Sequence, residues 1–305
     1  MPRVAHLLLV LAYSAPAFAA GDSATPWWIW PLALFAVTLA LGVIAVLAGV
    51  GGGVLFVPIV ASFFPFHIDF VRGAGLLLAL CGALSATPAL LRRDLASVRL
   101  AMPLALVASI TSIGGALLGF ALPTSVVETA LGTMILAIAA IMWARGRSDH
   151  PEVAASDALG AALRMHGVYH DAAAGRDFEW KVHRTPAGFA AFAGIGVLAG
   201  MFGLGAGWAN VPVLNLLMGV PLKLSVGTSG FLLSVVDSAA AWVYISRGAV
   251  LPILVVPSII GVMLGARIGA RLLTTAPASF VRRLVIAVLL LAGARALLKG
   301  IGLWT

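Results

Sequence analysis

Two glycine-rich strings are the residues of this chain best suited to chemistry. The first reads Gly49-Val50-Gly51-Gly52-Gly53 and the second reads Gly203-Leu204-Gly205-Ala206-Gly207, and each is soon followed by Val-Pro. Glycine is less favourable than alanine in a helix interior by roughly 1 kcal/mol, so each string predicts a helix break. Breaks expose backbone N–H groups, which together with the positive end of the next helix form a concave anion site. The glycines that we expect to line it are Gly49, Gly51, Gly52, Gly53, Gly203, Gly205 and Gly207.

Polar side chains near the second string can complete such a site. Asn210 follows the string directly, Asn215 lies five residues further on, and Thr228 and Ser229 are expected to open the next helix. Their amide and hydroxyl groups can donate to an anion, although each can instead satisfy backbone groups of a broken helix. The alternative for the glycines themselves is that they allow helices to cross closely, as small residues do in membrane bundles.

Asp237 is the only acidic residue near the middle of a long apolar segment. A carboxylate inside a membrane is unfavourable by roughly 2.5 to 3.5 kcal/mol on insertion scales, so it should face a partner or a wet cavity. Two interpretations follow, proton coupling or a structural pair with Arg267 or another buried donor. The functional hypothesis for Asp237 is proton coupling.

The composition is that of a polytopic membrane protein. Hydrophobic residues form 62% of the 305 residues and charged residues only 10%, and the mean hydropathy is +1.10. About 20 apolar residues cross a bilayer. The segments expected to span are 28–48, 73–91, 100–122, 126–143, 187–202, 225–246, 250–273 and 281–298, while the shorter segments 54–68 and 208–222 either span or re-enter.

The two hydrophobic halves form an internal repeat. Gly73-Ala74-Gly75 and Gly227-Thr228-Ser229 keep the offset of the glycine strings, whereas Gly115-x-x-x-Gly119 and Gly265-x-x-x-Gly269 fall short of it. The shortfall predicts a longer linker at 92–99 than at 247–249. With about five segments per half, an odd number, the second copy is inverted. We therefore predict an all-α integral membrane protein with two inverted repeats, 27–144 and 187–299, whose helices break at the glycine strings.

The remaining parts of the chain are polar or resemble targeting sequence. Residues 1–20 resemble a secretory signal peptide, with an uncleaved short helix as the alternative. Basic residues concentrate in the loops that an outside N-terminus would place in the cytoplasm, so topology rather than nucleic-acid binding explains the net charge of +8. Residues 145–186 carry much of the acidic content, and the alternation in 177–184 predicts a β-hairpin in a cytoplasmic linker.

Several chemistries have no support in the sequence. One cysteine, Cys81, excludes a disulfide framework. Nucleotide-binding, Ser-His-Asp and His-Glu-x-x-His motifs are absent, so we expect neither an enzyme nor a bound cofactor. His166, His170 and His183 lie in or beside the hairpin, where solvated histidines are more usual than ligands, and no metal site is expected.

The glycine strings with their Val-Pro, the stretch Val226-Gly227-Thr228-Ser229 and the pattern His166-Gly167-x-Tyr169-x-Asp171 together resemble the TauE/SafE sulfite exporter family of membrane permeases. The resemblance implies transport of a small sulfur-containing anion, sulfite or an organosulfonate, across the bacterial inner membrane. Inverted-repeat transporters of this kind work by alternating access, with proton coupling through Asp237 as one option. A passive anion channel or a membrane partner subunit is the alternative, although the continuous polar stripe that a channel needs is not evident.

Overall fold

The computed structural model describes residues 28–303 except 49–51, 64–65, 67, 145–150, 152, 172–174, 206 and 276–277. The expected signal peptide, 1–20, lies outside the described residues. The first half contains α2 (Ile29–Ala48), α3 (Gly53–Phe63), α4 (Ile68–Leu91), α5 (Val98–Gly119) and α6 (Thr124–Ala144). The linker contains α7 (Ala158–Ala162), β1 (His166–Asp171) and β2 (Arg176–Lys181). The second half contains α8 (Thr185–Phe202), α9 (Gly207–Pro212), the π-helix η2 (Val213–Leu217), α10 (Leu222–Ser246), α11 (Pro252–Thr275) and α12 (Ala278–Gly300).

Six of the described helices, α2, α4, α5, α8, α10 and α11, are long and apolar enough to cross a membrane. Large apolar side chains point outward from them, including Leu106 and Ile110 of α5 and Ile260 of α11, all at least half exposed. Water would disfavour such faces, whereas lipid tails accept them. The chain is therefore a multi-pass, predominantly helical membrane protein.

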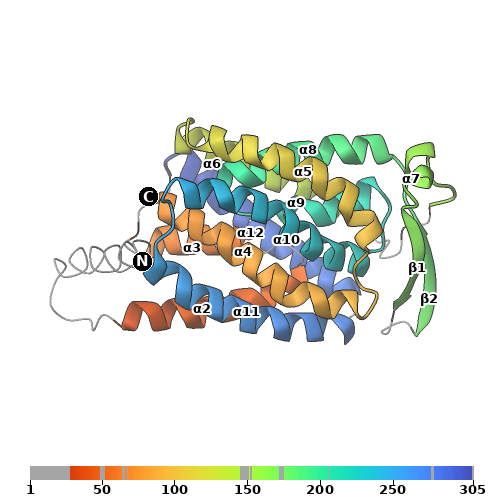
Figure 1. The fold of residues 1–305 in the computed structure, drawn as a ribbon, viewed down its shortest axis with the longest axis horizontal. Helices are drawn as coiled ribbons and strands as arrows, with labels where there is room; N and C mark the ends of the chain where they lie inside the picture. Colours follow the sequence, from red (N-terminus) through yellow and green to blue (C-terminus); the bar gives the residue numbers. More distant parts are fainter. Residues whose placement is uncertain are drawn as a thin grey trace, which may run out of the picture.

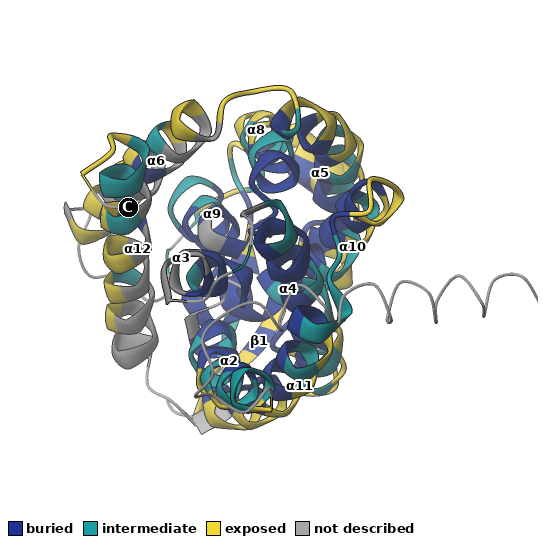
Figure 2. Cartoon of the chain, turned by 90° about the vertical axis from the view of Figure 1, so that its left-hand side faces the viewer, coloured by how far each residue is buried: buried dark blue, intermediate teal, exposed yellow. Residues whose placement is uncertain are grey.

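The helices pack in pairs that each combine one helix from either half. α2 packs on α11, α5 on α8, α6 on α12 and α4 on α10. In Figure 2, α3 and α9 lie between the α6 and α12 pair and the α4 and α10 pair. The buried side chains form a core around α4 and α10, and the two short helices α3 and α9 are thereby placed deep in the molecule.

The elements of the two halves keep a single offset. Helices that start at residues 53, 68, 98 and 124 have counterparts that start 154 residues later, at 207, 222, 252 and 278. The longer linker expected in the first half does not account for the shortfall of four residues, because six residues, 92–97, separate α4 from α5 and five residues, 247–251, separate α10 from α11. Gly115 thus corresponds to Gly269. The error arose because α11 carries glycines at 261, 265 and 269, one per turn, so the motif alone does not set the register.

The linker forms an antiparallel hairpin in which His170 of β1 lies opposite Asp177 of β2. Figure 1 shows the hairpin and α7 together at one end of the helical bundle. The buried side chains of Tyr169 and Trp180 anchor the hairpin, and the backbone N–H of His183 donates to the carbonyl of Met218 at 3.1 Å. The linker is thereby docked on the end of η2.

Asp157 fastens the linker to α8. Its carboxylate accepts hydrogen bonds from the backbone N–H of Gly160 at 2.9 Å, and from the N–H and hydroxyl of Thr185, both at 2.7 Å. Burial alone would raise the pKa of Asp157, but the three hydrogen bonds together outweigh it and hold the pKa below its ordinary value. The carboxylate is therefore both the N-cap of α7 and a bridge to the first turn of α8.

Candidate functional site

The second glycine string turns the chain sharply between α8 and α9. α8 ends at Phe202, and Gly203 and Gly205 follow with φ angles of 64° and 77°, a backbone conformation that glycine adopts without strain. A Cβ atom on Gly205 would lie 2.9 Å from Oδ2 of Asp237. The carboxylate of Asp237, fully buried, therefore lies directly against the second string. Gly207 begins α9 and is also buried.

The first string approaches the second in the interior of the molecule. Gly49 and Gly51 lie outside the described residues, while Gly52 is buried and Gly53 begins α3. A Cβ atom on Gly53 would lie 2.6 Å from two carbonyl oxygens, those of Gly75 and Leu204. A side chain at position 53 would clash with these carbonyl groups, so the close approach of α3 to α4 and to the second string requires glycine there. The structure brings together Gly53, the second string and Asp237.

Asn210 is the polar side chain of this region that lacks an evident structural task. It is 0% exposed, and neither its Nδ2 nor its Oδ1 has a hydrogen-bond partner among the described residues. A buried amide left unsatisfied costs about 1 to 3 kcal/mol, so such a group calls for an explanation. Asn215 is different, because its Nδ2 donates to the carbonyl of Val220 at 2.8 Å. Of the two asparagines, only Asn210 keeps its amide available for a ligand.

Thr228 and Ser229 do not open a helix as predicted. α10 already begins at Leu222, so both residues lie in its second turn, where both are buried. Pro221, in an extended conformation, ends the preceding loop and allows α10 to begin earlier than the hydropathy indicated. The hydroxyl of Thr228 accepts a hydrogen bond from the backbone N–H of Ser97 at 3.1 Å. Thr228 thus ties α10 to the start of α5.

Two basic residues that the sequence placed in loops are buried in helices. Arg72 lies inside α4 with 5% of its side chain exposed, and Lys223 lies in the first turn of α10 with 2% exposed. Arg267, the alternative partner for Asp237, is exposed on α11, whereas Asp237 is fully buried. This difference in burial does not favour a structural pair between them.

Tyr244 connects α10 to the end of α8. Its hydroxyl, which is buried, donates to the carbonyl of Gly200 at 2.9 Å, and the carbonyl of Met201 lies 3.4 Å away. The ring of Phe120 packs on the tyrosine ring with 5.1 Å between centroids. No sequence signal indicated this contact, because its partners are more than 40 residues apart along the chain.

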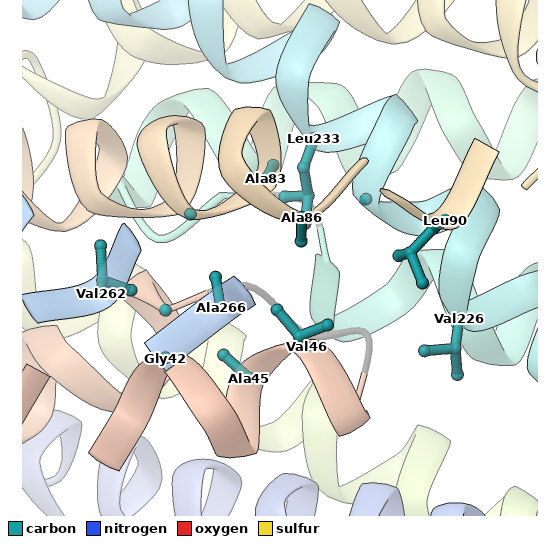
Figure 3. A pocket seen from close by; sticks show the side chains of 13 residues that line it. Gly42, Ala45, Val46, Ala83, Ala86, Leu90, Val226, Leu233, Val262 and Ala266 are labelled. Carbon is teal, nitrogen blue, oxygen red and sulfur yellow. The ribbon is translucent and has the colours of Figure 1, made fainter. Parts of the chain in front are cut away.

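An apolar cavity lies between α2, α4, α10 and α11 (Figure 3). A water-sized sphere has about 20 Å³ of room for its centre there, which is close to what one water molecule needs. The cavity reaches Gly52 of the first string and Leu233, whose side chain also approaches Gly205. It is lined entirely by small or aliphatic residues: Gly42, Ala45, Val46, Gly52, Gly82, Ala83, Ala86, Leu90, Val226, Gly230, Leu233, Val262 and Ala266.

The histidines of the hairpin do not form a cluster. Nδ1 of His170 lies 2.6 Å from Oδ1 of Asp177, and both side chains are exposed. His166 is opposite Lys181 in the hairpin register. In the described part of the chain, no three His, Cys, Asp or Glu side chains gather in a way that could hold a metal ion.

Long apolar helices around a buried crossing of glycine-rich segments, with polar side chains in the interior, are the features of a multi-pass membrane transport protein. The chain matches the model of the family described as Sulfite exporter TauE/SafE over residues 34–296, and it therefore belongs to that family. The match includes both halves and the linker. Comparisons with curated proteins and with solved structures gave no match.

Proposed function

We propose that this protein is a secondary transporter that moves a small sulfur-containing anion, sulfite or an organosulfonate, across the bacterial inner membrane by alternating access. The observation that carries the proposal is the contact between the two glycine strings, together with the unpartnered, fully buried amide of Asn210 three residues after the second string. Membership of the sulfite exporter family supports the substrate class. The amide Nδ2 and the N–H groups where α3 begins would donate to the anion oxygens.

Reciprocal contacts support an inverted repeat. A Cβ atom on Gly73 of α4 would overlap the carbonyl of Ala249 in the loop after α10, and one on Gly227 of α10 would overlap the carbonyl of Leu95 in the loop after α4. Each contact is the other displaced by the 154-residue offset. Such exchange is what a two-fold axis produces. The same relation holds for Gly42 with Val262 and Gly196 with Ala108.

The two halves of the proposed pathway differ at equivalent positions, and this difference supports alternating access. Leu90 and Val226 line the apolar cavity, and their counterparts at the 154-residue offset are Tyr244 and Arg72. On that second side the Tyr244 hydroxyl bridges to Gly200 and holds α10 against α8. One half therefore contains a small cavity, and in the equivalent half a hydrogen bond joins two of the helices. A channel would leave both halves open together, and no contact described above favours one.

The sidedness of the pathway follows from the basic residues. Arg92, Arg93 and Arg99 are exposed around the loop between α4 and α5, and Figure 1 places that loop at the same end as the linker hairpin. Cytoplasmic loops of membrane proteins carry an excess of such residues. We assign the linker and the apolar cavity to the cytoplasmic side. Tyr244 and Arg72 then belong to the outer half of the pathway.

Asp237 is the candidate for proton coupling. It is fully buried against Gly205, a glycine that Leu233 of the cavity lining also approaches. A carboxyl group at this point can exchange a proton with either side as the pathway alternates. The absence of a nucleotide-binding motif leaves an ion gradient as the energy source.

Asn210→Leu tests the binding site with a matched control. Leucine keeps the shape of asparagine and removes an amide that has no partner, so folding stability should be unchanged or higher. Sulfite and methanesulfonate binding, measured calorimetrically on purified protein, should weaken by roughly ten- to a hundred-fold. Asn215→Leu is the control: it leaves the carbonyl of Val220 without its donor and should lower the melting temperature, with little effect on affinity in the folded fraction.

The opposite pattern would overturn the assignment. Wild-type protein that binds neither sulfite nor methanesulfonate would contradict the proposed substrate class. Unaltered affinity in a folded Asn210→Leu variant would show that the amide is outside the binding site.

A further inference from the structure

Arg72 is a buried cation in an incomplete environment. Its side chain is 5% exposed, and its Nη1 lies 3.7 Å from Oδ1 of Asp69, which is beyond hydrogen-bonding distance. Its Nη2 is buried and has no hydrogen-bond partner among the described residues. Asp69 itself has 42% of its side chain exposed, so it is a weak counter-ion for a buried group. A guanidinium held in this way has donors available for another anion.

The backbone of Arg72 lies next to the second glycine string. A Cβ atom on Gly203 would lie 2.6 Å from the Arg72 carbonyl oxygen and 3.0 Å from its Cβ, so α4 and the string touch at this residue. At the 154-residue offset Arg72 corresponds to Val226, which lines the apolar cavity. When the outer half of the pathway opens, Arg72 would line the equivalent cavity on that side.

We propose that Arg72 is the anion-recognition residue of the outer half of the pathway, where its guanidinium binds two oxygens of sulfite or of a sulfonate. This inference rests on the proposed function and adds a sided selectivity to it. Arginine suits the task because its planar fork of N–H groups matches paired oxygens, whereas lysine offers a point charge. The inner half has Val226 in the equivalent place and relies on backbone and amide donors instead. The anion is therefore held more tightly from outside than from inside.

The test measures half-saturation separately on the two sides of the membrane. Cells or vesicles loaded with unlabelled sulfite exchange it for labelled sulfite outside, and the external concentration gives the outer half-saturation whatever the net direction of transport. Arg72→Gln should raise this value by roughly ten- to a hundred-fold, the usual size of a lost charge-assisted hydrogen bond. Arg72→Lys should raise it by less than about tenfold. Half-saturation from the linker side should stay within about twofold in both, an asymmetry that a purely structural role would not produce.

Two further variants make the result interpretable. Arg247→Gln removes an exposed arginine at the C-terminal end of α10, whose guanidinium packs over the ring of Phe120. This variant should leave both half-saturation values unchanged. Asp69→Asn removes the carboxylate nearest to Arg72 and should lower the outer value by about two- to fivefold, even if Arg72→Gln fails to fold.

The outcomes separate the two proposals. Wild-type protein that exchanges neither sulfite nor methanesulfonate contradicts the proposed function itself. Wild-type exchange combined with an unchanged outer half-saturation in folded Arg72→Gln, or with an unchanged or raised value in Asp69→Asn, overturns the role of Arg72 and leaves the proposed function standing. Equal increases on both sides of the membrane would also overturn it.

Discussion

The hydrogen bond of Tyr244 should help hold the outer half of the pathway closed. Tyr244→Phe removes the hydroxyl that donates to Gly200 at 2.9 Å and keeps the ring, whose packing against Phe120 is preserved. A typical buried hydrogen bond contributes about 1 kcal/mol net. In the proposed cycle the bond joins α10 to α8 only in the closed arrangement, so its loss should shift the equilibrium toward the outward-open state about fivefold.

The shift can be measured by cysteine labelling. The only native cysteine, Cys81, is first replaced by serine. Ala240, one turn before Tyr244 and fully buried, is then replaced by cysteine, since its counterpart Ala86 lines the apolar cavity. An impermeant maleimide added outside intact cells should label this cysteine about five times faster in the Tyr244→Phe background.

A matched control guards against general loosening of the helix. Ser246→Ala removes a hydroxyl that donates to the carbonyl of Val243 at 2.9 Å, a bond within α10 that joins no other helix. The labelling rate should be unchanged in this variant. The reasoning is refuted if Tyr244→Phe melts normally and labels at the wild-type rate, or if Ser246→Ala accelerates labelling as much.

Asp237→Asn keeps the side-chain shape and removes the titrating group, so sulfite exchange should persist while accumulation driven by a pH gradient is lost; wild-type accumulation under an imposed gradient would exclude the coupling role. Asp157 has a lowered pKa, so its stabilisation is complete above the ordinary aspartate pKa of about 3.9 and is lost as the pH falls further. Amide-exchange protection of α7 should therefore be constant from pH 7 to about 5 and drop below about 4, and a similar drop in Asp157→Asn would contradict this. A cysteine at the exposed Val168 of β1, with Cys81 replaced, should resist impermeant reagents in intact cells and react in inverted vesicles; ready labelling in intact cells would place the linker outside.

Sequence patterns predicted the local backbone features of the candidate site. A string such as Gly203-Leu204-Gly205 signals a break because glycine is unfavourable in a helix and free to adopt positive φ, and the structure has both glycines at positive φ. The isolation of Asp237 in an apolar segment likewise predicted a buried carboxylate, and the residue is fully buried. Both signals are local, and a single sequence carries local signals well.

Long-range features were not predictable in the same way. Hydropathy placed Arg72 in a loop, because a charged residue beside an apolar segment usually marks the end of that segment. In the structure α4 begins earlier, at Ile68, and therefore includes Arg72. The Tyr244 contact depends on α8 and α10 meeting, which no local pattern encodes. The alignment of α11 with α5 was mispredicted for another reason. Glycines repeated at every turn are equally compatible with several alignments.

The constant offset between the halves also bears on the resting state of the protein. In the proposed cycle, the inward-open and outward-open states are two wells related by exchange of the repeats, and identical repeats would make the wells equally deep. The equivalence of the two repeats is broken where Tyr244 and Arg72 occupy the positions that correspond to Leu90 and Val226. The Tyr244 hydroxyl bridge on one side has no equivalent among the aliphatic residues on the other. These few side chains therefore give the two states different free energies. A change in the preferred direction of transport during evolution therefore requires no change of fold. Substitutions at paired positions are enough to alter the free-energy difference between the two states.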